Sequence, residues 1–342
     1  LGSWYDIFLA GTLRAFGAIR ARSRSLRCRE TQRLIVGPWI HGPENVGRRK
    51  VGEMDFGPEA ELDLQALRLK WYGHWLNDEQ TGALDGPPVR VFLMGANRWL
   101  DLQDWPPPDA RPLSLYLREG TSGTADSLND GVLALEPPLG AERPDSYTYD
   151  PADPVPSLVG FPGLGPKDYR PVEPRMLTYT TDILTRDLAV VGPVRAELFA
   201  LSSAPDTDWM VRLCDVWPDG RSMLVCDGVL RASFRGSLGK PEPMTPGRVY
   251  RFDVDLWSTA QVFAAGHRIR VQVTSSDFPR YDRNLNTGEP FGQGVRGQPA
   301  INTVFHDSLR PSRVVVRVMG DSEGGSVRQS TRRSSPPEVD GR

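Results

Sequence analysis

The chain has 342 residues, of which 39% are hydrophobic and 25% charged, with a net charge of -2, as in an ordinary globular protein. This near-neutral charge gives no electrostatic reason to expect nucleic acid as a partner, and no apolar run approaches the ~20 residues of a membrane span. The cysteines (Cys28, Cys214 and Cys226) are odd in number and lack metal-type spacing, which predicts free thiols, a reduced and therefore cytoplasmic compartment, and no cofactor.

Residues 1–42 follow the pattern strand, helix, strand. Apolar side chains from Phe8 to Ile19 recur at helical spacing, which predicts an amphipathic helix. The arginine-rich stretch 20–29 is expected to be a solvated loop, and Leu34 to Val36 a buried strand. Because residue 1 is Leu and the chain starts inside a predicted strand, we expect it to be the C-terminal part of a longer protein.

A helix is predicted over residues 54–78. Its apolar stripe has spacings of three and four residues and consists of Leu64, Leu67, Trp71 and Trp75. His74 lies beside this stripe, where a packing or capping role is expected rather than catalysis. The run Asp85-Gly86-Pro87-Pro88 breaks the pattern and marks a predicted domain boundary.

From residue 88 to about 318 the hydrophobic pattern changes to period two, with turns rich in Pro and Gly. The expected strands include 89–93, 113–117, 269–273 and 314–318, together with a hairpin whose strands at 211–213 and 223–225 flank Pro218-Asp219-Gly220. Short strands of this kind predict a jelly-roll, galactose-binding-like β-sandwich. After Met319 the composition predicts a disordered tail.

Asp6 and His41 are the residues that suggest chemistry. Asp6 ends the first predicted strand, and His41 follows the second through a predicted turn at Gly37-Pro38. The order acid then histidine is that of the last two members of a Ser-Asp-His triad in an α/β-hydrolase. In that role Asp6 would orient His41, and His41 would act as general base. Asp6 as a cap of the following helix, and His41 as a loop histidine bonded to backbone, stay open as structural alternatives.

The sequence resembles the cocaine esterase family of hydrolases, which also contains the X-Pro dipeptidyl-peptidases, glutaryl acylases and α-amino acid ester hydrolases. The resemblance is carried by the segments Gly2–Asp6, Gly37–Gly42, Val51–Gly57, Tyr149–Pro156, Asp206–Trp209, Pro218–Arg221 and Gly266–Asn284. It extends over nearly all of residues 1–318. It implies an α/β plus all-β architecture: the C-terminal portion of an α/β-hydrolase domain over residues 1–86, a jelly roll over 87–318 and a tail over 319–342. It also implies that Asp6 and His41 occupy the triad acid and base positions.

The resemblance implies hydrolysis of a small acyl ester or amide through a serine acyl-enzyme. The family's Gly-x-Ser-Tyr-x-Gly elbow is absent, so the chain alone is expected to be inactive. Ser322 fits Gly-x-Ser-x-Gly but is rejected, because no apolar helix follows it and it comes after the acid and the histidine. Expected partners are the substrate and, as open possibilities, a second copy or an N-terminal hydrolase segment in trans. The alternative is a non-catalytic β-sandwich binding module.

Other residues carry weaker expectations. His267 and the loop 277–284 are expected to be structural, with Arg280 pairing with Asp282. The acid pairs Asp150 with Asp153 and Asp206 with Asp208 offer oxygen ligands to a cation, but neither resembles a complete loop site. Trp4 and Trp39 flank the acid and the base, and are expected to pack beneath them.

Overall fold

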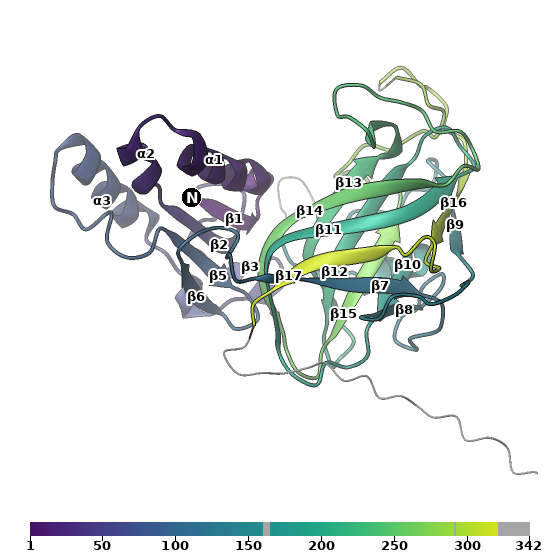
Figure 1. Cartoon of the computed structure of the whole chain (residues 1–342), viewed down its shortest axis with the longest axis horizontal. Coiled ribbons are helices and arrows are strands. Elements are labelled where there is room, and N and C mark those ends of the chain that lie inside the picture. Colours follow the sequence, from purple (N-terminus) through teal and green to yellow (C-terminus); the bar gives the residue numbers. More distant parts are fainter. Residues whose placement is uncertain (160–164, 291, 321–342) are drawn as a thin grey trace, which may run out of the picture.

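A computed structural model of the chain describes residues 1–159, 165–290 and 292–320, and contains two main β-sheets (Figure 1). The predicted disordered tail, apart from its first two residues, and the rejected Ser322 lie outside the described residues. We call the four-stranded sheet the small sheet and the eleven-stranded sheet the large sheet. Together they make a mostly β fold, and the large sheet is consistent with the predicted β-sandwich.

The small sheet has the strand order β1 (Gly2–Tyr5), β2 (Leu34–Ile40), β5 (Val89–Leu93), β6 (Arg98–Leu102). The first three strands are parallel and β6 is antiparallel to β5. Their buried runs, such as Val36, Val89 and Val91 at 0% exposure, are typical of parallel strands covered on both faces. Between β1 and β2 lie α1 (Leu9–Arg22) and α2 (Leu26–Glu30).

Several predictions for the first hundred residues were wrong in detail. Strands 89–93 and 98–102 pair in the small sheet, although the sequence pattern grouped the first of them with the sandwich. The arginine-rich stretch is not all loop, because Ser25 accepts from the Cys28 backbone N–H and begins α2. Of the helix predicted over 54–78 only α3 (Leu64–Leu76) forms, since Asp63 caps it there through the Ala66 N–H.

The residues before α3 adopt other structures. They form the hairpin of β3 (Lys50–Val51) with β4 (Met54–Asp55), followed by a 3-10 turn, η1 (Pro58–Ala60). Gly57, with φ of 78°, takes a backbone conformation outside any right-handed helix. The apolar stripe of α3 is only partly covered, because its two tryptophans are of intermediate exposure.

The large sheet runs in the order β13-β12-β15-β10-β8-β7-β17-β11-β16-β9, with β14 paired to β11. Its strands are β7 (Arg111–Arg118), β8 (Gly131–Ala134), β9 (Asp145–Tyr149), β10 (Leu177–Thr180), β11 (Leu188–Ser202), β12 (Asp208–Val216), β13 (Ser222–Arg231), β14 (Tyr250–Phe263), β15 (Arg268–Thr274), β16 (Ala300–Phe305) and β17 (Arg313–Val318). Two 3-10 turns, η2 (Arg170–Arg175) and η3 (Ala232–Phe234), connect them. The predicted hairpin is confirmed by the antiparallel pairing of β12 with β13, and the cysteines are free thiols as predicted.

The two sheets share a core, so the small sheet is held against the large one. The backbone of Met94, just after β5, donates to Ala260 O (2.9 Å) and accepts from Val262 N (2.8 Å) on β14. Val191, Ala260 and Val262 of the large sheet pack into one cluster with buried side chains of the small sheet. Each large apolar side chain buried in this way stabilises the fold by roughly 2 kcal/mol.

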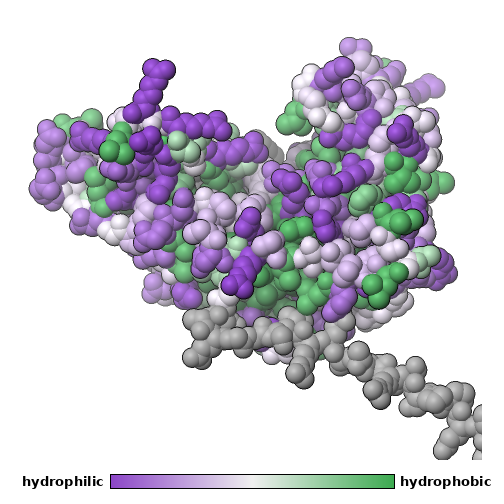
Figure 2. All heavy atoms as spheres, in the orientation of Figure 1, coloured by the Kyte–Doolittle hydropathy of each residue, from purple (hydrophilic) through white to green (hydrophobic). Residues whose placement is uncertain are grey.

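In the described ranges no helix is both long enough and apolar enough to cross a bilayer. Figure 2 shows polar residues over most of one face, with apolar side chains gathered in small patches rather than one continuous area.

Candidate functional site: an aspartate–histidine pair at the small sheet

Asp6 directly follows β1, in the turn that leads into α1. Its backbone N–H donates to Ser3 O (3.1 Å) and its carbonyl accepts from Leu9 N (3.1 Å), which fixes the turn. Its side-chain Oδ1 accepts from the Phe8 N–H at 2.8 Å. The carboxylate therefore has part of the helix-entry role that stayed open at the level of sequence, although the residue at the helix N-cap is Phe8.

His41 directly follows β2, the strand beside β1. The turn predicted at Gly37-Pro38 is wrong, because β2 continues through both residues to Ile40. Because β1 and β2 are parallel and Tyr5 is in register with Ile40, the residues after both strands emerge at the same edge of the sheet. The turn beyond His41 is held by Asn45, whose Nδ2 donates to His41 O at 2.7 Å, and by Gly42, whose φ of 107° suits glycine.

The expected contact between the two side chains is present: His41 Nδ1 lies 3.1 Å from Asp6 Oδ1. The histidine side chain is 34% exposed and the aspartate side chain 17% exposed. A carboxylate can only accept, so in the neutral ring Nδ1 carries the proton and Nε2 keeps its lone pair. Nε2 has no hydrogen-bond partner among the described residues, and is therefore free to take a proton from a reacting group.

Phe8 is a neighbour of this pair that sequence reasoning misplaced. The spacing assigned its ring to the packed face of α1, but Phe8 is 61% exposed and meets the His41 ring edge-on, with centroids 5.1 Å apart. Its position two residues after Asp6, and before the first helical residue, is the signal that could have separated it from the helix stripe.

Trp4 and Trp39, each two residues before a member of the pair, are buried in the core beside the small sheet. Trp4 donates its indole N–H to Phe92 O (2.8 Å) and Trp39 to Ala60 O (3.0 Å), and they are 4% and 0% exposed. Gly37 is required by this packing, because a Cβ there would lie 2.5 Å from the Trp39 ring. These buried indoles anchor the ends of β1 and β2, the strands that lead to Asp6 and His41.

The weaker candidates are held in structural contacts. His267 Nδ1 lies 2.8 Å from Asp215 Oδ1, a second aspartate–histidine pair. Burial raises the pKa of Asp215, opposed by its hydrogen bond and charge interaction with His267. The predicted pairing of Arg280 with Asp282 is wrong, because Arg280 instead binds Asp227 and Asp277.

The two acid pairs offer no cation site. Asp153 pairs with Arg175 at 2.8 Å, and Asp208 with Arg231 at 2.9 Å. Asp206 accepts from the backbone and hydroxyl of Ser233. Within the described ranges no group of three or more His, Cys, Asp or Glu side chains is placed to hold a metal ion.

His306 is a buried titratable residue that no sequence pattern singles out. Its two ring nitrogens lie 3.2 Å from Glu142 Oε2 and 3.0 Å from Asp145 Oδ2. Burial lowers its pKa, but the hydrogen bonds and charges of the two acids outweigh this, and the pKa is raised overall. The histidine therefore ties the ends of β9 and β16 together.

Comparisons with known proteins place the chain among hydrolases. Residues 81–315 match the family model of the X-Pro dipeptidyl-peptidase C-terminal non-catalytic domain. The chain is 39% identical to the cocaine esterase of Rhodococcus sp. strain MB1 Bresler over 329 residues, covering 92% of this chain and 55% of that protein. It thus spans about half the length of the relatives it matches.

Solved structures agree in fold. An aminopeptidase from a marine sediment archaeon superposes with a TM-score of 0.81 at 28% identity, over 93% of this chain and 54% of that one. An α-amino acid ester hydrolase superposes with a TM-score of 0.75 at 28% identity, over 92% and 54%. Asp6 and His41 precede the segment matched by the domain model, so that model says nothing of the pair.

Proposed function

We propose, from the premise that this chain belongs to the hydrolase family of cocaine esterase and the X-Pro dipeptidyl-peptidases, that Asp6 and His41 are the acid and base of a serine hydrolase. The observation that carries the proposal is the 3.1 Å contact between Asp6 Oδ1 and His41 Nδ1 at the edge where two adjacent parallel strands end. This arrangement fixes the histidine tautomer and leaves Nε2 free, as the base of a catalytic triad requires.

The small sheet would then be the C-terminal part of an α/β-hydrolase domain, predicted at residues 1–86, followed by a jelly roll over 87–318. Three features support this assignment: parallel strands, a helix crossing between the first two, and the acid and histidine placed after consecutive strands. The pairing of β5 and β6 with β2 argues for extending the hydrolase part to Leu102.

The proposed reaction is acyl transfer from a small ester or amide. A serine Oγ attacks the acyl carbon while His41 Nε2 takes the serine proton, and the imidazolium then returns that proton to the departing alcohol or amine. Water, deprotonated by the same nitrogen, then attacks the acyl carbon, and the bond from that carbon to the serine Oγ breaks as the imidazolium returns its proton to Oγ. Asp6 holds the ring in place and stabilises the charge that forms on it.

The nucleophile in this scheme lies outside residues 1–342. Among the described residues no serine, threonine or cysteine hydrogen-bonds Nε2 of His41, and we infer that the serine is supplied in the same polypeptide or by a second chain. Residues 1–342 alone should then give no ester hydrolysis above the blank, because loss of a triad nucleophile lowers the rate by about a millionfold.

A chimera tests the proposal. Residues 1–342 replace the matching segment of the Rhodococcus cocaine esterase, and hydrolysis of p-nitrophenyl acetate is measured. The chimera is expected to be active. His41→Ala should lower its kcat by at least 10,000-fold. The control His74→Ala, a substitution in the partly exposed α3, should leave kcat unchanged. A folded, active chimera that tolerates His41→Ala would refute the assignment.

The alternative is a binding module without catalysis. The matched domain model describes a non-catalytic domain, which favours this function for the large sheet. An aromatic binding face on that sheet would support it further. Among the described residues after Leu102, however, Phe278 is the only large aromatic side chain that is well exposed, at 37%, and it lies in the loop after β15. The Asp6–His41 contact therefore favours the hydrolase for the small sheet.

A further inference from the structure

A cleft of about 560 Å³ runs along β9 of the large sheet, far from Asp6 and His41 in the sequence. Five consecutive residues, Ser146 to Asp150, line it. Successive side chains of a strand point to opposite faces, so a cleft on one face would meet only every second residue. Because the run is unbroken, the cleft reaches the edge of the strand, and Ile301 of β16 extends its lining over the adjacent face.

The edge of β9 that faces away from β16 carries no strand. β9 lies at the end of the order of the large sheet, and in the described part of the chain it pairs with β16 alone. An unpaired edge presents backbone N–H and C=O groups that a second strand can bind.

The direction of these groups follows from the pairing of Ile301 on β16. Ile301 accepts from Ser203 N and donates to Ser203 Oγ, both at 2.9 Å, so its backbone groups point away from β9. Ile301 is opposite Thr148, which makes the two a non-hydrogen-bonded pair of the antiparallel ladder. The N–H and C=O of Thr148, and by the same alternation those of Ser146, therefore point out from the ladder into the cleft.

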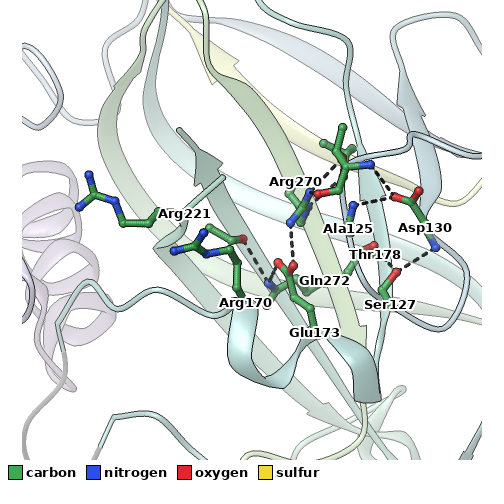
Figure 3. A network of polar contacts seen from close by, with 12 residues as sticks. Ala125, Ser127, Asp130, Arg170, Glu173, Thr178, Arg221, Arg270 and Gln272 are labelled. Atoms are coloured by element: carbon green, nitrogen blue, oxygen red, sulfur yellow. Dashed lines mark hydrogen bonds and ion pairs between the residues drawn. The ribbon is translucent and has the colours of Figure 1, made fainter. Parts of the chain in front are cut away.

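The opposite wall of the cleft is held by a buried ionic network. Arg270, 0% exposed, binds Glu173 of η2 at 2.7 Å and the carbonyl of Thr124 at 2.8 Å. Figure 3 shows this network, with Asp130 accepting from the Ala125 N–H and Ser127 joined to Thr178. Each of these contacts orders the wall segments before a ligand arrives.

The wall segments themselves belong to the loop 122–130 and to the end of η2. Leu128 N donates to Met176 O at 3.1 Å, which joins the two segments. They contribute Leu128, Pro174 and Arg175 to the cleft lining. A preordered wall lowers the entropy that a ligand loses on binding.

The lining suits an apolar segment with one basic side chain. Leu128 and Ile301 are 51% and 54% exposed at the cleft. Arg175 is already paired with Asp153, whereas the Asp150 carboxylate accepts from the Ala152 N–H and has no cationic partner among the described residues. The remaining negative charge favours Lys or Arg in the ligand.

We propose that β9 binds an extended peptide segment of another protein by strand addition, with backbone hydrogen bonds to Ser146 and Thr148. The peptide lies between β9 and the wall of Leu128 and Pro174, and places a basic side chain near Asp150. Recognition by strand addition takes its affinity from the backbone and its specificity from alternate side chains. This binding function is independent of the chemistry proposed for Asp6 and His41.

Panning of phage-displayed random linear hexapeptides on residues 1–342 supplies the probe. The most enriched peptide is synthesised with a fluorescent label, and its affinity is measured by anisotropy. Thr148→Pro removes the outward N–H without touching the ladder to β16, and is expected to weaken binding at least tenfold. Thr148→Ala, which keeps that N–H, is the matched control and should bind within about twofold of wild type.

Two further arms complete the experiment. The same peptide is also made in two N-methylated versions, one methylated at the odd-numbered residues and one at the even-numbered residues. Both are tested on the wild-type protein, so that misfolding of a variant cannot affect the result. The version that is methylated at the N–H groups facing β9 should lose binding. Asp150→Asn should weaken a peptide that contains Lys or Arg about threefold. Failure to enrich any peptide, or an affinity indifferent to both Thr148→Pro and N-methylation, would overturn the proposal.

Discussion

Two of the aspartate–histidine contacts among the described residues, both made through Nδ1 of the ring, have similar geometry and different surroundings. Asp6 and His41 meet at 3.1 Å at an edge of the small sheet, with the histidine side chain 34% exposed. Asp215 and His267 meet at 2.8 Å in the large sheet, where the histidine side chain is 19% exposed. The contact alone therefore does not define a site. The strand ends that present the pair, and the exposure of the histidine side chain, decide what it can do.

His267 lies in a turn that uses its backbone as well as its ring. Its N–H donates to Ala264 O, its carbonyl accepts from Leu184 N, and its ring lies 5.9 Å from that of Trp217. His41 also has a ring neighbour, Phe8, but among the described residues its backbone makes one contact of this kind, through its carbonyl to Asn45. The first pair is therefore expected to serve reactivity and the second to serve stability.

Replacing each aspartate by asparagine in the cocaine esterase chimera should separate the two pairs by the largest margin. Asp6→Asn should lower kcat by about ten-thousandfold, because the histidine loses the partner that fixes its tautomer. Asp215→Asn should leave kcat within a few-fold. Equal losses of kcat in the two variants would contradict the division of roles.

The Arg270–Glu173 pair of the large sheet is expected to affect folding stability rather than kcat. Arg270→Met leaves the buried carboxylate of Glu173 without its cation, and should lower the free energy of unfolding by about 3–5 kcal/mol. Denaturant titration of residues 1–342 measures this. The double variant Arg270→Met with Glu173→Leu should recover part of the loss, and a double variant as unstable as the single one would show that the unpaired charge is not the cause.

His306 gives the large sheet a pH dependence. Its pKa is raised above the ordinary value of 6.5 by the hydrogen bonds and charges of Asp145 and Glu142. Its contribution to stability is therefore fully present below that ordinary value and is lost as pH rises through the raised pKa. The stability difference between wild type and His306→Gln, measured by denaturant titration, should shrink from pH 6 to pH 9. A difference that grows over this range would show the sign to be wrong.

Phe8 should give the smallest effect. Its ring meets the His41 ring from the solvent side, so Phe8→Ala should lower kcat of the chimera no more than about tenfold and change the free energy of unfolding by about 0.5 kcal/mol or less. Phe8→Leu, which removes the ring but keeps a large apolar side chain, is the matched control. A loss as large as that of Asp6→Asn would mean that Phe8 takes part in the chemistry.

The contact between Asp6 and His41 could be predicted from the sequence because both follow short apolar strands, and parallel neighbours bring such positions together. The hairpin of β12 and β13 could be predicted because a Pro-Asp-Gly turn separates two apolar runs. The catalytic roles of Asp6 and His41 remain predictions, as do the domain boundaries.

Other features depend on residues far apart in the chain. His306 is 161 residues from Asp145, and Arg270 is 97 from Glu173, so local patterns carry no sign of either contact. The residues before α3 look helical by spacing, but Gly57 and the cap at Asp63 override that periodicity. Strand 89–93 has the same alternation whichever sheet it joins, so its place beside β2 is set by tertiary packing alone.

Whether Asp6 orients His41 with a proton on Nδ1 can be measured by ¹⁵N NMR of residues 1–342 with labelled histidine. At a pH where the ring is neutral, the wild-type His41 signals should show a protonated Nδ1 and a free Nε2, and Asp6→Asn should move the ring toward the other tautomer. A wild-type His41 with its proton on Nε2, or a tautomer indifferent to Asp6→Asn, would contradict the role assigned to this pair.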